Sequence, residues 1–182
     1  MKKYLLAIII ISAVVMASGC INNGNQTGNN TSNNTKTYSG DEFTFNYPAN
    51  WQIITSQAQN STVAVGDPNS ADSNGNAQVN VVIQKAILPS DMTLQDYYNA
   101  VYAQFSNQSL GYKPISDGSI DVNGRPALEN VYKINSGIQK QERAVWLQNN
   151  NVIYIILCSA PVYDYSNYQA NFDTIVNSFK LI

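Results

Sequence analysis

The sequence predicts an α+β fold, a three-layer α/β/α sandwich around a central, mostly antiparallel sheet. The first observation is the run Val152–Cys158, which is apolar at every position. A strand of this kind must be covered on both of its faces. The second observation is a pair of amphipathic helical patterns, one in mid-chain and one at the C-terminus. These two helices supply one layer for each face of the sheet.

Four strands are expected before the first helix: Phe43–Tyr47, Trp51–Thr55, Ser61–Gly66 and Gln78–Ile87. In the first of them aromatic residues alternate with polar ones, which is typical of a strand with one buried face. Pro48 ends this strand, because proline cannot donate a hydrogen bond to a neighbouring strand. The loop Asp67–Asn76 is rich in Asp, Asn and Ser, residues that favour turns.

A helix is expected to begin after Thr93. Thr93 and Asp96 have the spacing of a capping box, in which each side chain accepts a hydrogen bond from the backbone N–H of the other residue. The following residues place an apolar stripe along one face of the helix: Leu94, Tyr97, Tyr98, Val101, Tyr102 and Phe105. Aromatic residues can form a stacking platform for a ligand, but their helical spacing favours packing against the sheet.

A β-hairpin is expected around Asn123-Gly124, which is the strongest short signal for a two-residue turn. It joins the predicted strands Gly118–Val122 and Ala127–Ile134. Pro126 follows the turn directly, so it must lie at the first residue of a strand or on an edge.

A second hairpin joins Gln139–Gln148 to Val152–Ser159 through three consecutive asparagines. The second of these strands contains the apolar run and is therefore expected at the centre of the sheet. A final helix is expected from about Asp164. Its apolar stripe consists of Tyr165, Tyr168, Phe172, Ile175, Val176 and Phe179.

Residues 1–19 have the features of a signal peptide. A short basic start precedes the apolar run Tyr4–Met16, which is shorter than the ~20 residues that a membrane-spanning helix needs. Ala17-Ser18-Gly19 before Cys20 resembles the lipobox of bacterial and archaeal lipoproteins, in which the cysteine thiol takes a lipid and becomes the new N-terminus. The alternative is an ordinary signal peptide with a chance cysteine. We expect export and a lipid on Cys20 that holds the protein at the outer face of the cytoplasmic membrane.

Residues 20–37 are predicted to form a flexible, Asn-rich tether, and residues 38–182 a single folded domain. The tether has almost no apolar residues with which to form a core. Six asparagines in the chain open an N-x-Ser/Thr sequon: Asn25, Asn29, Asn30, Asn33, Asn60 and Asn107. Either the segment is a glycosylated stalk, or its composition produces these sequons by chance.

The composition excludes several kinds of site. The chain has no histidine, which removes Ser–His and Cys–His nucleophile pairs and imidazole metal ligands. After Lys2 and Lys3 are set aside, 8 Lys and Arg residues face 12 Asp and Glu residues, a net charge of −4. An acidic domain with scattered bases is a poor nucleic-acid binder. Cys158 lies in the apolar run and is interpreted as a buried small hydrophobe, with a reactive thiol as the alternative.

The beginning and end of the predicted domain resemble the PsbP family. The opening has the pattern F-x-F-x-Y-P-x-x-W, which Phe43, Phe45, Tyr47, Pro48 and Trp51 fill. The chain closes with the I-x-x-S-F ending typical of the final helix of this family, and the resemblance spans residues 37–182. The family comprises extrinsic proteins of photosystem II and their prokaryotic relatives. The lipobox and the Asn-rich stalk indicate a prokaryotic surface protein, and we expect an archaeal one.

The resemblance implies a fold shared with DcrB-like bacterial lipoproteins and a Ran-binding nuclear transport factor, none of which is an established enzyme. Their common theme is protein association. Plant members help to retain calcium and chloride, but no family pattern of metal ligands can be placed on this sequence. No cofactor is therefore expected.

Weak calcium binding is the one metal hypothesis that the residues themselves raise. Asp67, Asp72, Asn74 and Asn76 crowd one loop, and three of them resemble the start of an EF-hand. The glycine is misplaced, however, and Ile83 stands where an EF-hand has its bidentate glutamate. The alternative is an ordinary turn rich in Asp and Asn.

Two functions remain after these observations. The first is a non-catalytic binding or assembly module that holds a protein partner at the membrane. The second is an envelope-associated hydrolase that uses a pair of carboxylates. The missing histidine and the missing catalytic motifs favour the first.

Overall fold

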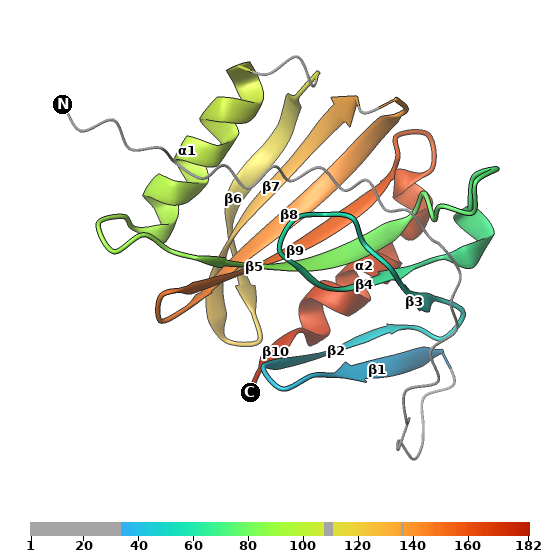
Figure 1. Ribbon diagram of the computed structural model, residues 1–182, viewed down its shortest axis with the longest axis horizontal. Coiled ribbons are helices and arrows are strands. Elements are labelled where there is room, and N and C mark those ends of the chain that lie inside the picture. Colours follow the sequence, from blue (N-terminus) through green and yellow to red (C-terminus); the bar gives the residue numbers. More distant parts are fainter. Residues whose placement is uncertain (1–33, 108–110, 136) are drawn as a thin grey trace.

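The computed structural model describes residues 34–107, 111–135 and 137–182, and it shows two sheets and two α-helices (Figure 1). The larger sheet has seven strands in the order β3-β4-β5-β9-β8-β7-β6, and every neighbouring pair is antiparallel. Its strands are β3 (Gln52–Ile54), β4 (Ser61–Gly66), β5 (Asn80–Ile87), β6 (Lys113–Val122), β7 (Arg125–Asn135), β8 (Gln139–Asn149) and β9 (Val152–Pro161). The predicted α+β class is confirmed.

Strand β9 is the middle strand of this sheet, as its apolar run predicts. Ile155 and Ile156 are both fully buried, and they belong to two different core clusters. Because successive side chains of a strand point to opposite faces, the two residues anchor the two layers that cover the sheet. The three-layer arrangement follows from this strand.

Helix α1 (Leu94–Asn107) covers one face. The capping box is present: the Asp96 backbone N–H donates to Thr93 Oγ1 at 3.1 Å, and the Thr93 N–H donates to Asp96 Oδ2 at 3.3 Å. The aromatic stripe packs around Trp146 of β8, whose indole N–H donates to the Tyr102 hydroxyl at 3.1 Å. The stripe is therefore part of the core and does not form a ligand platform.

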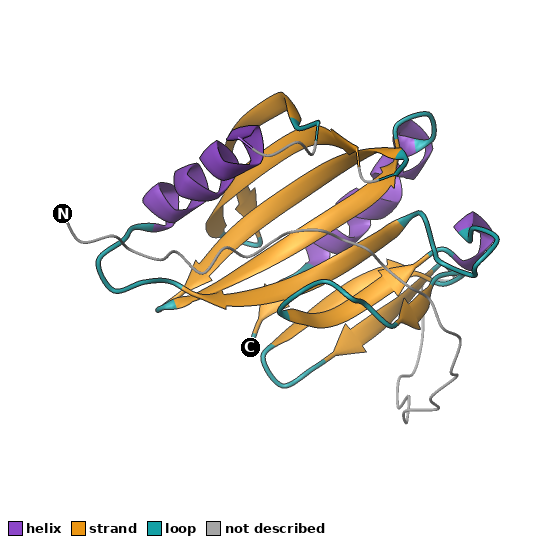
Figure 2. Cartoon of the chain, turned by 45° about the horizontal axis from the view of Figure 1, so that its top comes forward, coloured by secondary structure: helices purple, strands orange, loops and turns teal. Residues whose placement is uncertain are grey.

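Helix α2 (Tyr165–Ser178) covers the other face, together with a second sheet that the sequence did not predict. This sheet has the order β1-β2-β10, with β1 (Thr35–Ser39), β2 (Phe43–Pro48) and β10 (Lys180–Leu181), and Figure 2 shows it as a separate group of strands. Its inward side chains stack on the helix end, with the rings of Phe43 and Phe179 5.2 Å apart. The second layer is thus a helix and a small sheet side by side.

The β6–β7 hairpin has the expected turn and is tied to α2. Asn123 and Gly124 have φ angles of 52° and 78°, which suit a two-residue hairpin turn. The Asn123 side-chain amide donates to the backbone carbonyls of Asn177 at 3.0 Å and Phe179 at 2.8 Å. These two hydrogen bonds hold the C-terminal end of α2 against the β6–β7 turn.

The folded domain begins earlier than residue 38. Residues 35–37, which the sequence assigns to the tether, lie in β1 and pair with β2, with Thr35 opposite Pro48. The leader and residues 20–33, including Cys20, lie outside the described residues. In the part of the chain that the structure describes, no helix is long and apolar enough to cross a membrane.

Candidate binding groove

A cavity of about 430 Å³ opens between α2 and the face of the sheet formed by β6, β7 and β8. We call it the α2 groove. It is lined from the sheet by Ser116, Glu129, Val131, Gln141 and Arg143, and from the helix side by Val162, Tyr165, Ser166, Gln169 and Asp173. Most of these side chains are polar, so the groove is suited to hydrogen-bonded recognition more than to binding an apolar ligand.

Strand register places the floor residues next to one another. Val131 lies between Ser116 on β6 and Arg143 on β8, so these three residues form one row across the sheet. Glu129 lies two residues before Val131 on the same strand and therefore on the same face.

Arg143 joins the sheet to the helix inside the groove. Its Nε donates to Glu129 Oε1 at 2.6 Å, and its Nη1 donates to Asp173 Oδ1 at 2.6 Å. The Arg143 side chain is only 16% exposed. Burial disfavours the charged guanidinium, yet the hydrogen bonds to the two carboxylates leave the pKa of Arg143 raised. Arg143 therefore links β8 to β7 through Glu129 and to α2 through Asp173, and we call these three side chains the clamp.

Three exposed apolar residues lie next to lining residues at one end of the groove. Ile115 is 50% exposed, Ile138 42% and Tyr163 84%. Ile115 and Tyr163 are the sequence neighbours of the lining residues Ser116 and Val162. Ile138 lies close to Val162, because the Val162 backbone N–H donates to the carbonyl of the next residue, Gln139. The start of β6, the β7–β8 turn and the connection from β9 to α2 lie at the same end of the sheet (Figure 1). We call Ile115, Ile138 and Tyr163 the apolar rim.

The opposite face of the sheet carries a row of buried polar side chains. Register aligns Tyr132, Glu142, Ser159 and Asn80 across β7, β8, β9 and β5. Ser159 Oγ donates to Glu142 Oε1 at 3.4 Å. The Glu142 carboxyl is 3% exposed, and its burial raises its pKa to about 7, although Tyr132, Lys140 and Ser159 partly oppose this. A carboxyl in this position changes its charge near neutral pH.

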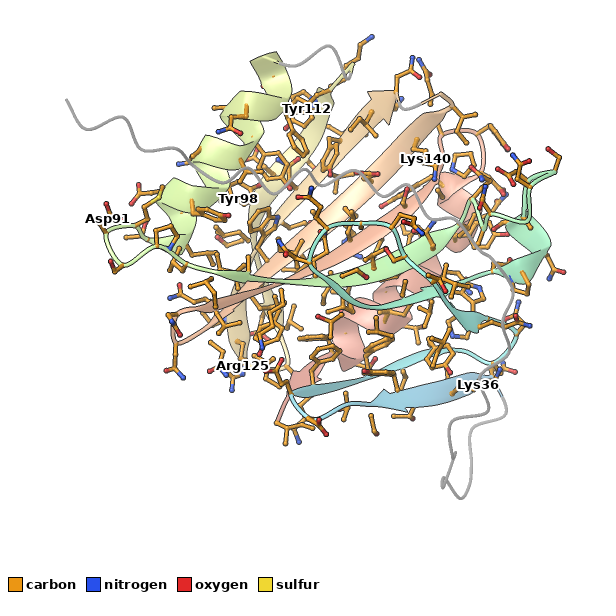
Figure 3. All side chains as sticks on the ribbon, viewed as in Figure 1. Lys36, Asp91, Tyr98, Tyr112, Arg125 and Lys140 are labelled. Atoms are coloured by element: carbon orange, nitrogen blue, oxygen red, sulfur yellow. The ribbon has the colours of Figure 1, made fainter. Side chains whose placement is uncertain are left out.

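This face also holds buried side-chain amide oxygens that accept no hydrogen bond. Among the described residues, Asn80 Oδ1, Gln84 Oε1 and Asn130 Oδ1 have no hydrogen-bond partner. Figure 3 shows Lys140, on the same strand as Glu142, at the end of the sheet opposite to Arg125. Unsatisfied buried acceptors are costly, so this polar row lowers the stability of the core.

A second cavity, of about 610 Å³, lies beneath the N-terminus of α1 at the far end of the sheet from the apolar rim. Thr93, Leu94 and Gln95 line it from the helix, and Arg125 and Leu128 are among its residues from β7. Arg125 is the one charged residue among the lining residues, and it is exposed, so this cavity has no buried charged group in its lining.

Comparison with known proteins places the chain in a family. Residues 4–181 match the model of the PsbP-like protein family, which is nearly the whole chain. The chain belongs to the PsbP-like family. No curated protein matches it by sequence.

Solved structures confirm the fold of this PsbP-like protein. Cyanobacterial PsbP from Synechocystis sp. PCC 6803 is similar, with a TM-score of 0.63 and 18% identity over 87% of this chain and 98% of that one. LpqN of Mycobacterium tuberculosis has a TM-score of 0.61 and 10% identity over 82% and 92% of the two chains. The Ran-binding protein Mog1p of Saccharomyces cerevisiae has a TM-score of 0.54 and 9% identity over 82% and 96%.

The calcium candidates of this PsbP-like chain serve as turn residues. Asp67 caps a short 3-10 helix (Pro68–Ser70) by accepting from the Asn69 N–H at 2.9 Å, and it also accepts from the Tyr168 hydroxyl at 2.9 Å. Asp72 accepts from the backbone N–H groups of Asn74 and Asn76, each at 2.9 Å. The hydrogen bonds with Asn76 and Asn74 lower the pKa of Asp72. Among the described residues no group of three or more His, Cys, Asp or Glu is placed to hold a metal ion.

The sequons are placed only in part. Asn60 is exposed, in a turn with a φ angle of 57°, directly before β4. Asn107 is the last residue of α1, and its side chain lies outside the described part, as do Asn25, Asn29, Asn30 and Asn33. Their glycosylation stays a prediction.

Cys158 is a buried core residue, as predicted. Burial raises the pKa of its thiol to about 12, so the thiolate form is disfavoured.

Sequence reasoning missed the α2 groove, although one signal was present. Gln141 and Arg143 alternate with Lys140, Glu142 and Ala144 in β8, so that both faces of one end of this central strand carry polar side chains. Of these two faces, the one with Gln141 and Arg143 is only partly buried and borders the groove, whereas Lys140 and Glu142 on the other face are buried.

Proposed function

We propose that this PsbP-like protein is exported, anchored through a lipid on Cys20, and serves as a non-catalytic module that holds a protein partner at the membrane. The observation that carries the binding role is the combination of the α2 groove with the apolar rim. Exposed aromatic and aliphatic side chains beside a polar groove are typical of the anchors of protein interfaces. The rim places three of them at one end of the domain.

Two structural relatives support a role in association. One is described as a Ran-binding protein, and the other as involved in cell envelope biogenesis. Both share the fold at low identity, so they support a class of function and no particular partner. A lipid anchor would raise the local concentration of the domain around membrane-bound partners.

The hydrolase alternative depends on two carboxylates that meet in the groove, Glu129 and Asp173. A glycosidase-type pair needs one carboxyl free to protonate the leaving group and space between the two for the substrate. Here the Arg143 guanidinium stands between them and donates to both. This geometry supports a structural clamp, and we propose that the protein has no hydrolytic activity.

The proposal is tested by crosslinking in membranes of the source cell. The full chain is compared with a double variant, Ile138→Ser with Tyr163→Ser, and with the control Ile87→Ser, which changes another exposed apolar residue, at the C-terminal end of β5. We expect a discrete crosslinked protein with the wild type and the control, reduced at least tenfold with the double variant. Identical crosslinked proteins in all three samples would contradict the proposal.

A further inference from the structure

Two lysines face each other beside the α2 groove. Lys113 on β6 is directly opposite Lys133 on β7, and Lys133 is in turn opposite Gln141 on β8, which lines the groove. Lys133 lies two residues after Val131 and so on the same face of the sheet. The row Lys113–Lys133–Gln141 therefore continues the groove floor toward the apolar rim.

This arrangement of like charges is unfavourable, and in the described part of the chain no ion pair compensates it. Like charges directly opposite each other across two strands destabilise the pair. Among the described residues, ion pairs form at Lys85 and Arg143, and no carboxylate lies within 4.0 Å of Lys113 or Lys133. The nearby carboxylates of Glu129 and Asp173 are already bound to Arg143. The two ammonium groups are thus available to an external anion.

We infer that the α2 groove binds an acidic, extended segment of the protein partner, with a carboxylate between Lys113 and Lys133. This inference rests on the proposed function and adds the chemistry of the partner. The carboxylate relieves the repulsion between the lysines. The neighbouring residue of the segment supplies an apolar side chain to Ile138 and Tyr163. Gln141 and Gln169 offer amide donors and acceptors to its backbone.

The charge of the domain favours a local protein contact over a membrane surface. The domain is acidic, with a net charge of −4 outside the leader, so an anionic bilayer repels it as a whole. A single carboxylate needs only the local field of two lysines, which is effective within about 8 Å at physiological salt. The concave shape of the groove, about 430 Å³, also fits a chain segment better than a flat bilayer.

The test uses the full chain and two acetylated synthetic peptides, one of alternating Glu and Leu and one with Gln in place of each Glu. Binding is measured by fluorescence anisotropy at low and at high salt. We expect the Glu peptide to bind at least tenfold more tightly than the Gln peptide at low salt, and the difference to shrink at high salt. The double variant Lys113→Gln with Lys133→Gln should remove this preference, whereas the control Lys180→Gln should keep it.

Equal affinity for both peptides, no binding of the Glu peptide, or a preference that survives the double lysine variant would overturn the inference. Binding to vesicles with 30% phosphatidylglycerol that depends on the same lysines would also overturn it, in favour of a membrane contact. Membrane crosslinking with the lysine variant separates the two proposals. If that variant keeps the crosslinked partner while the rim variant loses it, the acidic-segment inference fails and the proposed function stands. If neither variant loses the partner, both fail.

Discussion

Arg143 of β8 and Asp173 of α2 form an ion pair of 2.6 Å that joins the sheet to the helix inside the groove. The same guanidinium bonds Glu129 on β7, so one side chain fixes the positions of two strands and a helix. Replacing it leaves two carboxylates facing each other without their counterion.

We predict that Arg143→Ala lowers the free energy of unfolding by roughly 2–4 kcal/mol, because breaking a largely buried pair leaves uncompensated charge. The matched control is Lys85→Ala, which breaks a more exposed pair with Glu42 and should lower the free energy of unfolding clearly less. Urea unfolding at neutral pH measures both. Equal losses would show that the clamp does not hold α2 on the sheet.

Glu142 should make the stability of the domain depend on pH. Its pKa is raised from 4.5 to about 7 in the folded state, so the folded protein holds this proton more tightly than the unfolded chain. The stabilising contribution is complete below about pH 4.5 and is lost as the pH rises to about 7, a difference of roughly 3 kcal/mol.

The variant Glu142→Gln should therefore be more stable than the wild type at pH 8 and lack this dependence between pH 5 and pH 8. Urea unfolding at the two pH values measures the effect, and Asp91→Asn, an exposed carboxylate, is the control. A wild-type chain whose stability does not fall between pH 5 and pH 8 relative to Glu142→Gln would contradict the buried-carboxyl assignment.

The two faces of β9 should contribute comparably to the core. Ile155→Ala and Ile156→Ala should each cost about 2–5 kcal/mol, because each leaves a cavity in a fully buried cluster. Ile53→Ala on the exposed edge strand β3 should cost less than about 1 kcal/mol. A near-neutral change at either β9 position in urea unfolding would mean that one layer does not cover the sheet.

Strand β1 determines how many N-terminal residues can be removed without lowering the stability of the domain. A chain that begins at Asn34 should melt at the same temperature as the full mature protein. One that begins at Tyr38 should melt several degrees lower, because it lacks the pairing of Thr35–Thr37 with β2. Thermal unfolding followed by circular dichroism distinguishes them, and equal melting temperatures would show that β1 contributes nothing before Tyr38.

The lipid anchor is tested directly at Cys20. In the source cell Cys20→Ser should release the protein into the medium or leave an uncleaved precursor, since no other residue of the lipobox carries a thiol. Intact-mass spectrometry of the wild-type chain should show a lipid-modified N-terminal cysteine. A mature chain with an unmodified Cys20 would contradict the anchor.

Much of the fold could be predicted because its signals are local. The spacing of the α1 stripe, the turn at Asn123-Gly124 and the apolar run in β9 each follow from a few neighbouring residues. The second sheet could not be predicted in this way, because β10 has only two residues and its pairing with Phe43 joins the two ends of the domain. Local patterns do not reveal a contact between residues so far apart in sequence.

The α2 groove could not be predicted from the sequence for a related reason. Arg143, Glu129 and Asp173 lie on three elements, and only strand register and the angle of α2 bring them together. The calcium candidates were conspicuous because they are adjacent in sequence, yet their carboxylates cap turns. The residues of the groove, by contrast, are far apart along the chain, so local patterns could not reveal them.

Site-specific photocrosslinking at the apolar rim tests the central claim most directly. A photoreactive phenylalanine analogue replaces Tyr163, and in a separate control it replaces Ile53 on β3, at the opposite edge of the sheet from β6. We predict a discrete protein adduct in source-cell membranes from position 163 and none from position 53. Adducts of the same size and yield from both positions, or no adduct from position 163, would contradict the claim that this end of the domain holds a partner.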